Sequence, residues 1–459
     1  MKVSNMNHQA KALVLVAFLL VLSGTFQCSS SYAYEPHDSK KTQTLSPNQL
    51  GSFVFRLSGS VHQGSYTVNM EIGNPPMPYT LDMDTGSYVT WIQCDAPCIN
   101  CLQAPHRPYK PPRIDAALCQ DHMCDFVDHP ANYPCRQPND RCHYEVQYAD
   151  GALSIGLLVR DSFPLHLTTG FSRPTLIFGD FMFSDSLIFR CGFDQRVPPS
   201  TLPNVDGILG LGRSPLTIAS QLRAQGLIQN VFGHCIGSRD GYLFFGAHSP
   251  SPGTVWMQMA GHHRDDYSPG HGDILFDGKV TPLKQLEVVF DSGSTYTIFA
   301  PHAYTATLAL VRIKLIISTV RNSLRGTPLR EINDDTYLPV CWKGPKRYRV
   351  VGEVRNYFKH MALLFSRTNN AQLQLPPEAY LIISPSGNVC FGILNGAHLG
   401  LENLNLIGGK ICTNISLQDK LVIYDNEREL IGWVPSNCNA RVAHHPNSSS
   451  TLPAESPST

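Results

Sequence analysis

The sequence predicts an all-β protein with a few short helices, built from two related lobes. Strand-length apolar runs are separated by Gly, Pro, Asn and Asp over most of residues 52–438, which is typical of strands joined by turns. The 459 residues include 35 glycines and 34 prolines, a surplus that favours turns over long helices. A third observation is that one motif, Asp-(Thr/Ser)-Gly-Ser, occurs twice, at residues 84–87 and 291–294.

The repeat extends beyond the Asp motif. Each copy follows a strand-like apolar run, and each is followed at nearly the same distance by two apolar residues and a glycine, at 208–210 and 406–408. A single Asp-x-Gly-Ser would be ordinary turn chemistry. Two elements that recur in one order and at matched spacing indicate two lobes, each supplying one Asp loop.

Charge and composition exclude several classes of protein. The chain has 36 Lys and Arg against 36 Asp and Glu, so it lacks the basic surplus of a nucleic-acid-binding protein. Hydrophobic residues make up 42% of the chain, which is enough for a large core and excludes global disorder. No run after the N-terminus has the length of a membrane span, so we expect no stable membrane anchor. No oligomerisation signal is visible, and we expect a monomer.

The N-terminus has the layout of a signal peptide. Lys2 and Lys11 precede an apolar run at residues 12–22, and small residues at 31–33 offer a cleavage site. We therefore predict a signal peptide at residues 1–33 and a protein of the secretory pathway, extracellular or vacuolar. The alternative, a buried N-terminal helix, does not explain why these three regions occur in this order.

Cysteine usage fits an oxidising compartment. The chain has 14 cysteines, and Cys28 leaves with the predicted signal peptide. The cluster between Cys94 and Cys142 indicates disulfides. A zinc site at Cys94, Cys98 and Cys101 is the alternative, although no second pair with matching spacing accompanies it.

Two Asp loops that meet between the lobes would bring Asp84 and Asp291 together. Two carboxylates in one site cannot both ionise cheaply, so one of them keeps a proton. The ionised member can take a proton from a water held between them, while the other donates one to a substrate carbonyl oxygen. We predict both residues to be catalytic and assign neither role to one of them, because such a pair titrates as a unit.

The neighbours of each Asp suit this role. The glycines let the backbone turn sharply and approach a carboxylate closely, and the hydroxyl groups can orient the carboxylates. These positions are Gly86, Gly293, Thr85, Ser87, Ser292 and Ser294. The motifs of serine hydrolases, zinc peptidases and P-loop enzymes are absent from the sequence. We expect no metal and no cofactor.

The paired motifs resemble those of the pepsin-like aspartic proteases, and the chain looks most like their plant nucellin-like branch. The resemblance spans residues 52–438 and is carried by stretches such as LDMDTGSYVTWIQCDAPCINC, CHYEVQYADGALSIGLLVRD, VDGILGLGRS and VVFDSGSTYTIF. It implies a bilobal pepsin-like fold with the active site in the cleft between two β lobes. It also implies a polypeptide substrate, an acidic optimum and no cofactor.

The resemblance assigns roles to further residues. Tyr148 matches the tyrosine of a hairpin flap that closes over substrate, and Trp91 matches the tryptophan that supports this tyrosine. Gly86 and Gly293 join Tyr148 as residues that face the substrate. Taken alone, Tyr148 would be an ordinary strand aromatic and Trp91 an ordinary core residue.

The resemblance also divides the chain. After the signal peptide we expect a pro-segment at 34–57, like the activation peptide of the family. A lobe at 58–246 would carry Asp84 and the flap, a lobe at 247–440 would carry Asp291, and 441–459 would be a disordered polar tail.

Other stretches add detail. Helices are expected at 215–226 and 301–325, each with a proline near its first turn. Asn414 and Asn447 begin glycosylation sequons. We expect the stretch that holds three histidines to be a solvated loop, with a metal site as the alternative; they are His262, His263 and His271.

Three features depart from the family pattern. Tyr88 follows the first Asp motif where this branch has Asp, and we expect its side chain to lie outside the carboxylate pair. Residues 312–320 look like an addition, either as extra helical turns or as a bulging loop. Residues 409–413 look like an insertion, after which Asn414 takes the place of an Asp that would cap a helix.

The insertion at 409–413 bears most on function, because it adjoins the strand expected to support the Asp291 loop. Displacing a carboxylate by an ångström can cost about 10²-fold in rate. The insertion also contains Cys412. Without Cys28 the mature chain has an odd number of cysteines, and without Cys412 as well the number is even. We therefore expect Cys412 to be the unpaired thiol. The alternative to an acid endopeptidase is a catalytically impaired relative that acts as a binding or inhibitor protein. An incorrect gene model is a third explanation of the extra segments.

Overall fold

A computed structural model gives the fold of the part of the chain that begins at Leu50. It describes residues 50–60, 65–95, 104–110, 116–149, 151–172, 187–196, 204–238, 240–263, 265–294, 296–322, 329–333, 335, 338–365, 371–408 and 416–439. The predicted signal peptide, most of the predicted pro-segment, the insertion at 409–413, the asparagines of both sequons and the polar tail lie outside the described residues.

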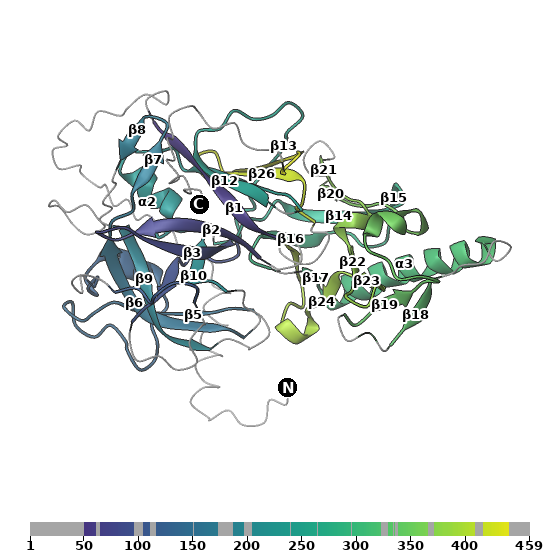
Figure 1. The fold of residues 1–459 in the computed structure, drawn as a ribbon, viewed down its shortest axis with the longest axis horizontal. Coiled ribbons are helices and arrows are strands. Elements are labelled where there is room, and N and C mark those ends of the chain that lie inside the picture. The colour runs from purple at the N-terminus through teal and green to yellow at the C-terminus, as the bar shows by residue number, and fades with distance from the viewer. Residues whose placement is uncertain are drawn as a thin grey trace, which may run out of the picture. The chain divides into compact units, whose positions relative to one another are not determined.

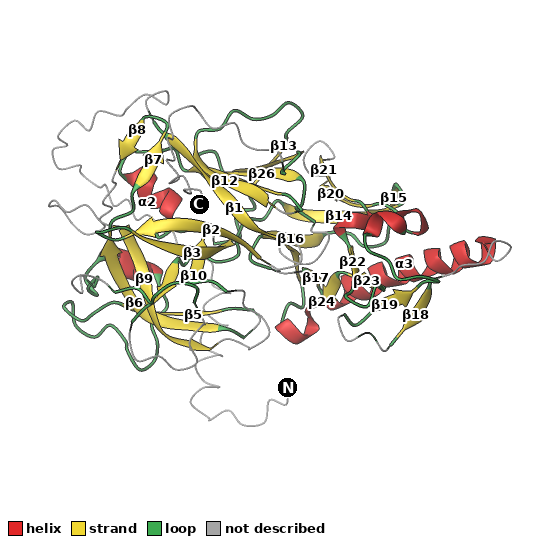
Figure 2. Ribbon diagram, in the orientation of Figure 1, coloured by secondary structure: helices red, strands yellow, loops and turns green. Residues whose placement is uncertain are grey.

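Strands dominate the described chain, which confirms the all-β prediction (Figure 2). The two strand-like runs that precede the Asp motifs both lie in strands, Met77–Asp84 and Leu286–Asp291. Within the described residues, 13 strands form the first sheet. They are β1 Ser52–Ser60, β2 Ser65–Ile72, β3 Met77–Asp84, β4 Trp91–Gln93, β5 His143–Gln147, β6 Leu153–Asp161, β9 Leu187–Arg196, β10 Gly207–Gly210, β11 Val231–Ile236, β12 Asp240–Gly246, β13 Val255–Gln258, β26 Lys420–Asp425 and β27 Leu430–Pro435. Their order is β13-β27-β26-β11-β12-β1-β2-β3-β10-β4-β9-β6-β5.

The later part of the chain builds the other large sheet. In the described ranges this sheet has eight strands, ordered β21-β20-β14-β16-β25-β17-β24 with β15 paired to β14. Their bounds are β14 Gly270–Phe276, β15 Lys279–Val280, β16 Leu286–Asp291, β17 Thr297–Phe299, β20 Met361–Phe365, β21 Ala371–Leu375, β24 Ile393–Asn395 and β25 Leu404–Gly408. A smaller sheet runs β18 Arg330–Ile332, β19 Cys341–Lys343, β23 Val389–Phe391, β22 Leu381–Ile383, and β7 Leu165–Leu167 pairs with β8 Gly170–Ser172.

The first sheet joins strands from both predicted lobes (Figure 1). Strand β26, near the C-terminus, pairs antiparallel with β11, whose other neighbour is β12. Strand β1 pairs with β12 from Ser52 to Ser58 and with β2 from Ser58 to Ser60. The last residues of the predicted pro-segment, 52–57, therefore form ladder hydrogen bonds in the middle of this sheet.

The internal repeat has a structural counterpart in two parallel strand pairs. Strand β10 pairs with β3 so that Gly210 lies opposite Asp84, and β25 pairs with β16 so that Gly408 lies opposite Asp291. The two apolar-apolar-Gly triplets thus lie directly beside the strands that end in the two Asp loops.

Helices are few, and one of them is shorter than predicted. Helix α2 spans Ile218–Ala224, because Thr217 is extended and its side chain accepts a hydrogen bond from the N–H of Ser220. The chain turns away again at Gly226, which has a φ of 70°. The predicted range of 215–226 was therefore too long at both ends. Short 3₁₀ helices lie at His122–Phe126, Val351–Glu353, Arg355–Tyr357, Pro377–Ala379 and Gly396–Leu399.

Helix α3 spans Pro301–Asn322 and begins at its proline, as predicted. It runs without interruption through residues 312–320, so the additional segment forms extra helical turns rather than a bulging loop. Among the described residues, no helix has both the length and the apolar composition that crossing a bilayer requires.

Four disulfides brace the described chain and confirm the prediction of disulfide bonds. They join Cys119 to Cys135, Cys124 to Cys142, Cys235 to Cys438 and Cys341 to Cys390. Cys94 is also disulfide-bonded, which speaks against the zinc alternative for that cluster.

The two glycines opposite the Asp residues provide a test of the repeat. A Cβ on Gly210 would lie 2.3 Å from the backbone N of Val89, and one on Gly408 would lie 2.1 Å from the carbonyl oxygen of Tyr296. We expect Gly210→Ala and Gly408→Ala each to lower the free energy of unfolding by about 1–3 kcal/mol, because the loop after each Asp must move. Urea unfolding measures this.

Gly261→Ala is the matched control, because nothing lies within 4 Å of its added Cβ. Its effect should stay within about 0.5 kcal/mol. If Gly210→Ala and Gly408→Ala destabilise the protein no more than this control does, the two triplets do not support the loops by close packing.

Candidate active site

Crossed hydrogen bonds join the two Asp loops. The N–H of Thr85 donates to Oγ of Ser292 over 3.0 Å, and the N–H of Ser292 donates to Oγ1 of Thr85 over 2.8 Å. Each hydroxyl then donates to the carbonyl before the opposite Asp, that of Phe290 or Met83, over 3.2 and 3.3 Å. Because Thr85 and Ser292 are completely buried, water does not compete for these bonds.

This arrangement brings the two predicted catalytic carboxylates together. A Cβ built on Gly293 would lie 1.9 Å from Oδ1 of Asp84 and 3.0 Å from Oδ1 of Asp291. A Cβ built on Gly86 would lie 2.5 Å from Oδ1 of Asp291. Both carboxylates therefore face one point between the loops, and only glycine leaves room for them at positions 86 and 293.

Donors within each loop hold its carboxylate. The N–H of Gly86 donates to Oδ1 of Asp84 over 2.9 Å, and the hydroxyl of Ser87 donates to Oδ2 over 2.6 Å. Such hydrogen bonds fix the orientation of the carboxylate.

The second loop holds the carboxylate of Asp291 with different donors. The N–H groups of Gly293 and Ser294 donate to Oδ1 of Asp291 over 2.8 and 3.0 Å. The hydroxyl of Ser294 donates to the carbonyl of Tyr296 instead. Of the four hydroxyl groups predicted to orient the carboxylates, the hydroxyl of Ser87 binds one directly, while those of Thr85 and Ser292 lock the loops together.

Tyr148 lies near Asp84, at the end of the hairpin formed by β5 and β6. Its N–H donates to the carbonyl of Ala152 over 2.8 Å, which closes the hairpin turn. The indole N–H of Trp91 donates to the phenol oxygen of Tyr148 over 2.8 Å, and a further hydrogen bond links this phenol with the side chain of Ser87. Since Ser87 gives its proton to Asp84, a directed chain runs from Trp91 through Tyr148 and Ser87 to the carboxylate.

The environment keeps this phenol neutral. Burial, and next the charge of Asp84, raise the pKa of Tyr148 far above its ordinary value.

Tyr88, the departure after the first Asp motif, is half-buried and packs against the apolar cluster that contains Val89 and Trp91. Its side chain is thus placed toward the core.

Sequence reasoning missed two residues behind the loops. Tyr424, on β26, is hydrogen-bonded to the side chain of Thr85, and its phenol oxygen lies 3.2 Å from Nε2 of His234 on β11. His234 is completely buried, and its Nδ1 has no hydrogen-bond partner among the described residues. A buried N–H without an acceptor is rarely tolerated, so the proton is assigned to Nε2, which donates to Tyr424. No local motif marks either residue, because strand pairing brings them together.

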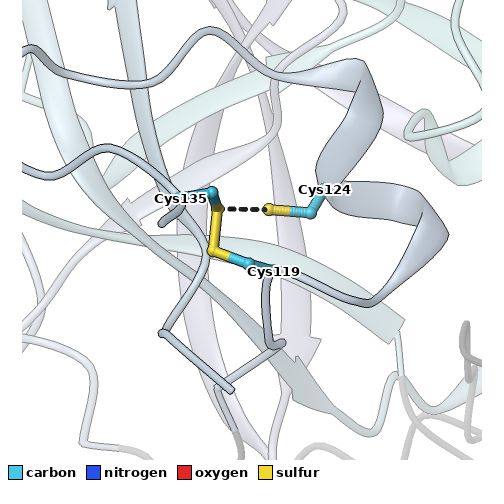
Figure 3. A group of neighbouring side chains, drawn as sticks. All are labelled: Cys119, Cys124 and Cys135. Carbon is cyan, nitrogen blue, oxygen red and sulfur yellow. Dashed lines mark hydrogen bonds between the residues drawn. A yellow bond between two sulfur atoms is a disulfide. The ribbon is translucent and has the colours of Figure 1, made fainter. Parts of the chain in front are cut away.

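The described residues also contain groups that resemble metal sites. Three of the four include cysteines that are held in disulfides. Figure 3 shows one of these, in which the sulfur of Cys124 lies 3.7 Å from that of Cys135, itself bonded to Cys119. The fourth group consists of His262, His263 and Glu287 and contains no cysteine.

The chain is similar to known protein families and to several known proteins. The chain matches the family described as xylanase inhibitor N-terminal over residues 66–247 and the family described as xylanase inhibitor C-terminal over residues 275–435. It is 42% identical over 398 residues to an aspartic proteinase of Oryza sativa subsp. indica, covering 84% of this chain and 91% of that protein. The chain belongs to the plant pepsin-like aspartic protease family.

More distant members of this family and solved structures agree with the assignment. Aspartic proteinase nepenthesin-1 of Nepenthes gracilis is 24% identical over 424 residues, covering 88% of this chain and 84% of that protein. Basic 7S globulin from soybean superposes with a TM-score of 0.60 at 15% identity, covering 84% of this chain and 95% of that one. The aspartic proteinase from Irpex lacteus gives a TM-score of 0.54 at 15% identity, with coverage of 84% and 98%. These likenesses confirm the bilobal pepsin-like fold, while the nucellin-like branch stays a prediction.

The buried imidazole of this aspartic protease homologue gives a prediction about stability at acidic pH. Burial lowers the pKa of His234 to about 3, whereas an unfolded histidine has a pKa of about 6.5. Between these values the unfolded chain binds a proton that the folded chain does not, so stability falls as the pH falls. In His234→Gln we expect the slope of unfolding free energy against pH to decrease by up to about 1.4 kcal/mol per pH unit.

Urea unfolding between about pH 4 and pH 6 measures this slope. His398→Ala, which removes an exposed imidazole, is the control and should keep the slope of the wild-type protein. A His234→Gln slope equal to that of the wild type would mean that His234 is protonated in the folded protein.

Proposed function

We propose that the protein is an aspartic endopeptidase that hydrolyses peptide bonds at acidic pH through a water activated by Asp84 and Asp291. The observation that carries this proposal is that both carboxylates face one point, between two loops locked by Thr85 and Ser292. A water at that point can lose a proton to the ionised carboxylate while it attacks the substrate carbonyl. The protonated carboxylate donates to the oxygen of that carbonyl.

An acidic optimum is part of this proposal, because the reaction needs one carboxylate ionised and the other protonated. The half-buried phenol of Tyr148 and the buried phenol of Tyr424 stay neutral at acidic pH, since burial raises the pKa of each.

The hairpin that carries Tyr148 is proposed to close over a polypeptide substrate. Its phenol is held by Trp91 on one side and Ser87 on the other, so the hairpin is linked to the Asp84 carboxylate through two hydrogen bonds. Closure of a flap excludes water and fixes the scissile bond. Gly86 and Gly293, which have no side chains, leave the carboxylates accessible from the substrate side.

The proposed site of action is the secretory pathway, with the extracellular space or the vacuole as the final location. The disulfides of the described chain fit an oxidising compartment, and they agree with the N-terminal layout of a signal peptide. We propose that the protein is a monomer and that a short pro-segment is cleaved from it.

A binding or inhibitor protein is the second candidate, and it rests on the insertion at 409–413. This segment lies outside the described residues. Up to Gly408, however, β25 keeps its full pairing with β16, and Asp291 keeps both of its N–H donors. The described part of the second loop thus supports the enzyme.

Cleavage of denatured globin by the purified mature protein, from about pH 3 to pH 7, tests the proposal. We expect activity in the acidic range that pepstatin abolishes. Asp84→Asn and Asp291→Asn should each lower kcat by at least about 10²-fold, because one member of the acid–base pair is lost.

Ser294→Ala is a control, because its hydroxyl donates to the carbonyl of Tyr296 and contacts neither carboxylate in the described hydrogen bonds. It should retain most of the activity. A folded monomer that shows no cleavage across this pH range, even after removal of the pro-segment, would contradict the enzyme and favour the binding protein.

A further inference from the structure

Two imidazoles and one carboxylate converge at the beginning of strand β16. His262 and His263 lie in the loop between β13 and β14, and Glu287 is the second residue of β16. Nε2 of each imidazole lies 2.7 Å from the same oxygen, Oε1 of Glu287. The three ligand atoms all lie within 4.8 Å of one another. The loop that was expected to be merely solvated is therefore anchored to the strand that ends at Asp291.

A second carboxylate orients one of these imidazoles. Nδ1 of His263 lies 3.3 Å from Oδ2 of Asp266, and its Nε2 faces Oε1 of Glu287 on the other side of the ring. With the proton on Nδ1, donated to Asp266, Nε2 is the nitrogen that offers a lone pair. That lone pair faces the same place as the ligand atoms of His262 and Glu287.

We infer that His262, His263 and Glu287 form a binding site for a divalent transition-metal ion, with Zn²⁺ as the expected occupant. Two imidazole nitrogens and one carboxylate oxygen are a ligand set that Zn²⁺ takes in three-ligand sites with a fourth position for water. Mg²⁺ and Ca²⁺ prefer oxygen ligands, so they do not suit two imidazoles.

The surroundings complete a metal site. Asp266 orients His263 through the ring nitrogen that faces away from the ion, an arrangement typical of metal-bound histidines. The side chains of His262 and Glu287 are 54% and 27% exposed, which leaves a path for the ion from solvent.

Such an ion would connect elements that support the proposed catalytic loops. Glu287 pairs with Leu404 in the parallel strands that end at Asp291 and Gly408. A guanidinium N–H of Arg213 donates to the carbonyl of His263 over 2.9 Å, which links the same loop to the segment after β10. An ion bound only by the folded chain stabilises it by linkage. This inference does not depend on the proposed proteolytic activity.

Isothermal titration with ZnCl₂ tests the site, on the metal-stripped, tag-free chain at about pH 7.5. We expect one high-affinity ion per chain. His262→Ala and Glu287→Gln should each weaken binding by at least about 10-fold, because each removes one ligand. His398→Ala, which removes another exposed imidazole, should bind as the wild type does. At about pH 5 binding should be weaker, since the imidazoles must lose their protons to bind a metal.

The thermal midpoint gives a second readout that does not depend on calorimetric heats. Saturating ZnCl₂ should raise the midpoint of the wild type and of His398→Ala, but not that of His262→Ala. Because the side chain of His262 is 54% exposed, this variant should fold even if Glu287→Gln does not. The inference is overturned if the wild type shows no saturable binding at about pH 7.5, or if binding is the same in His262→Ala.

Discussion

The crossed hydrogen bonds between Thr85 and Ser292 are the constraint on which the rest of the site depends. They are buried and reciprocal, and they connect two loops more than 200 positions apart in the sequence. Each hydroxyl also binds the carbonyl that precedes the opposite Asp, so neither loop can shift without breaking bonds of the other. Asp84 and Asp291 therefore reach one point because the backbone holds them there, and a buried donor left unpaired would cost about 1–3 kcal/mol.

Further layers of structure support these loops from behind. The glycines at the ends of β10 and β25 let the chain after each Asp lie directly against them. Tyr424 then joins the side chain of Thr85 to His234 in the central sheet. The chain gains a rigid polar site at the cost of a buried imidazole that cannot easily bind a proton. This loss of stability occurs at acidic pH, where the protein is proposed to act. Four disulfides of the described chain stabilise it there by constraining the unfolded chain.

The sequence predicted the parts of this account that are local or repeated. The two Asp motifs and their triplets are short and occur twice, so pattern alone placed Gly210 and Gly408 beside the loops. The contact between Trp91 and Tyr148 came from the resemblance to a family. The contacts of His234 with Tyr424, and of Glu287 with two histidines, could not be predicted, because they depend on the register of strands distant in sequence. The late start of α2 was missed because the capping role of Thr217 overrides the favourable position of Pro215.

A crystal structure of the mature protein with pepstatin tests the central claim most directly. Pepstatin carries a hydroxyl group where the attacking water would stand. The account predicts that this hydroxyl lies within hydrogen-bonding distance of both Asp84 and Asp291, with the bonds between Thr85 and Ser292 intact. A structure in which the Asp291 carboxylate points away from the inhibitor, displaced by residues 409–413, would contradict the account and leave the protein without a catalytic pair.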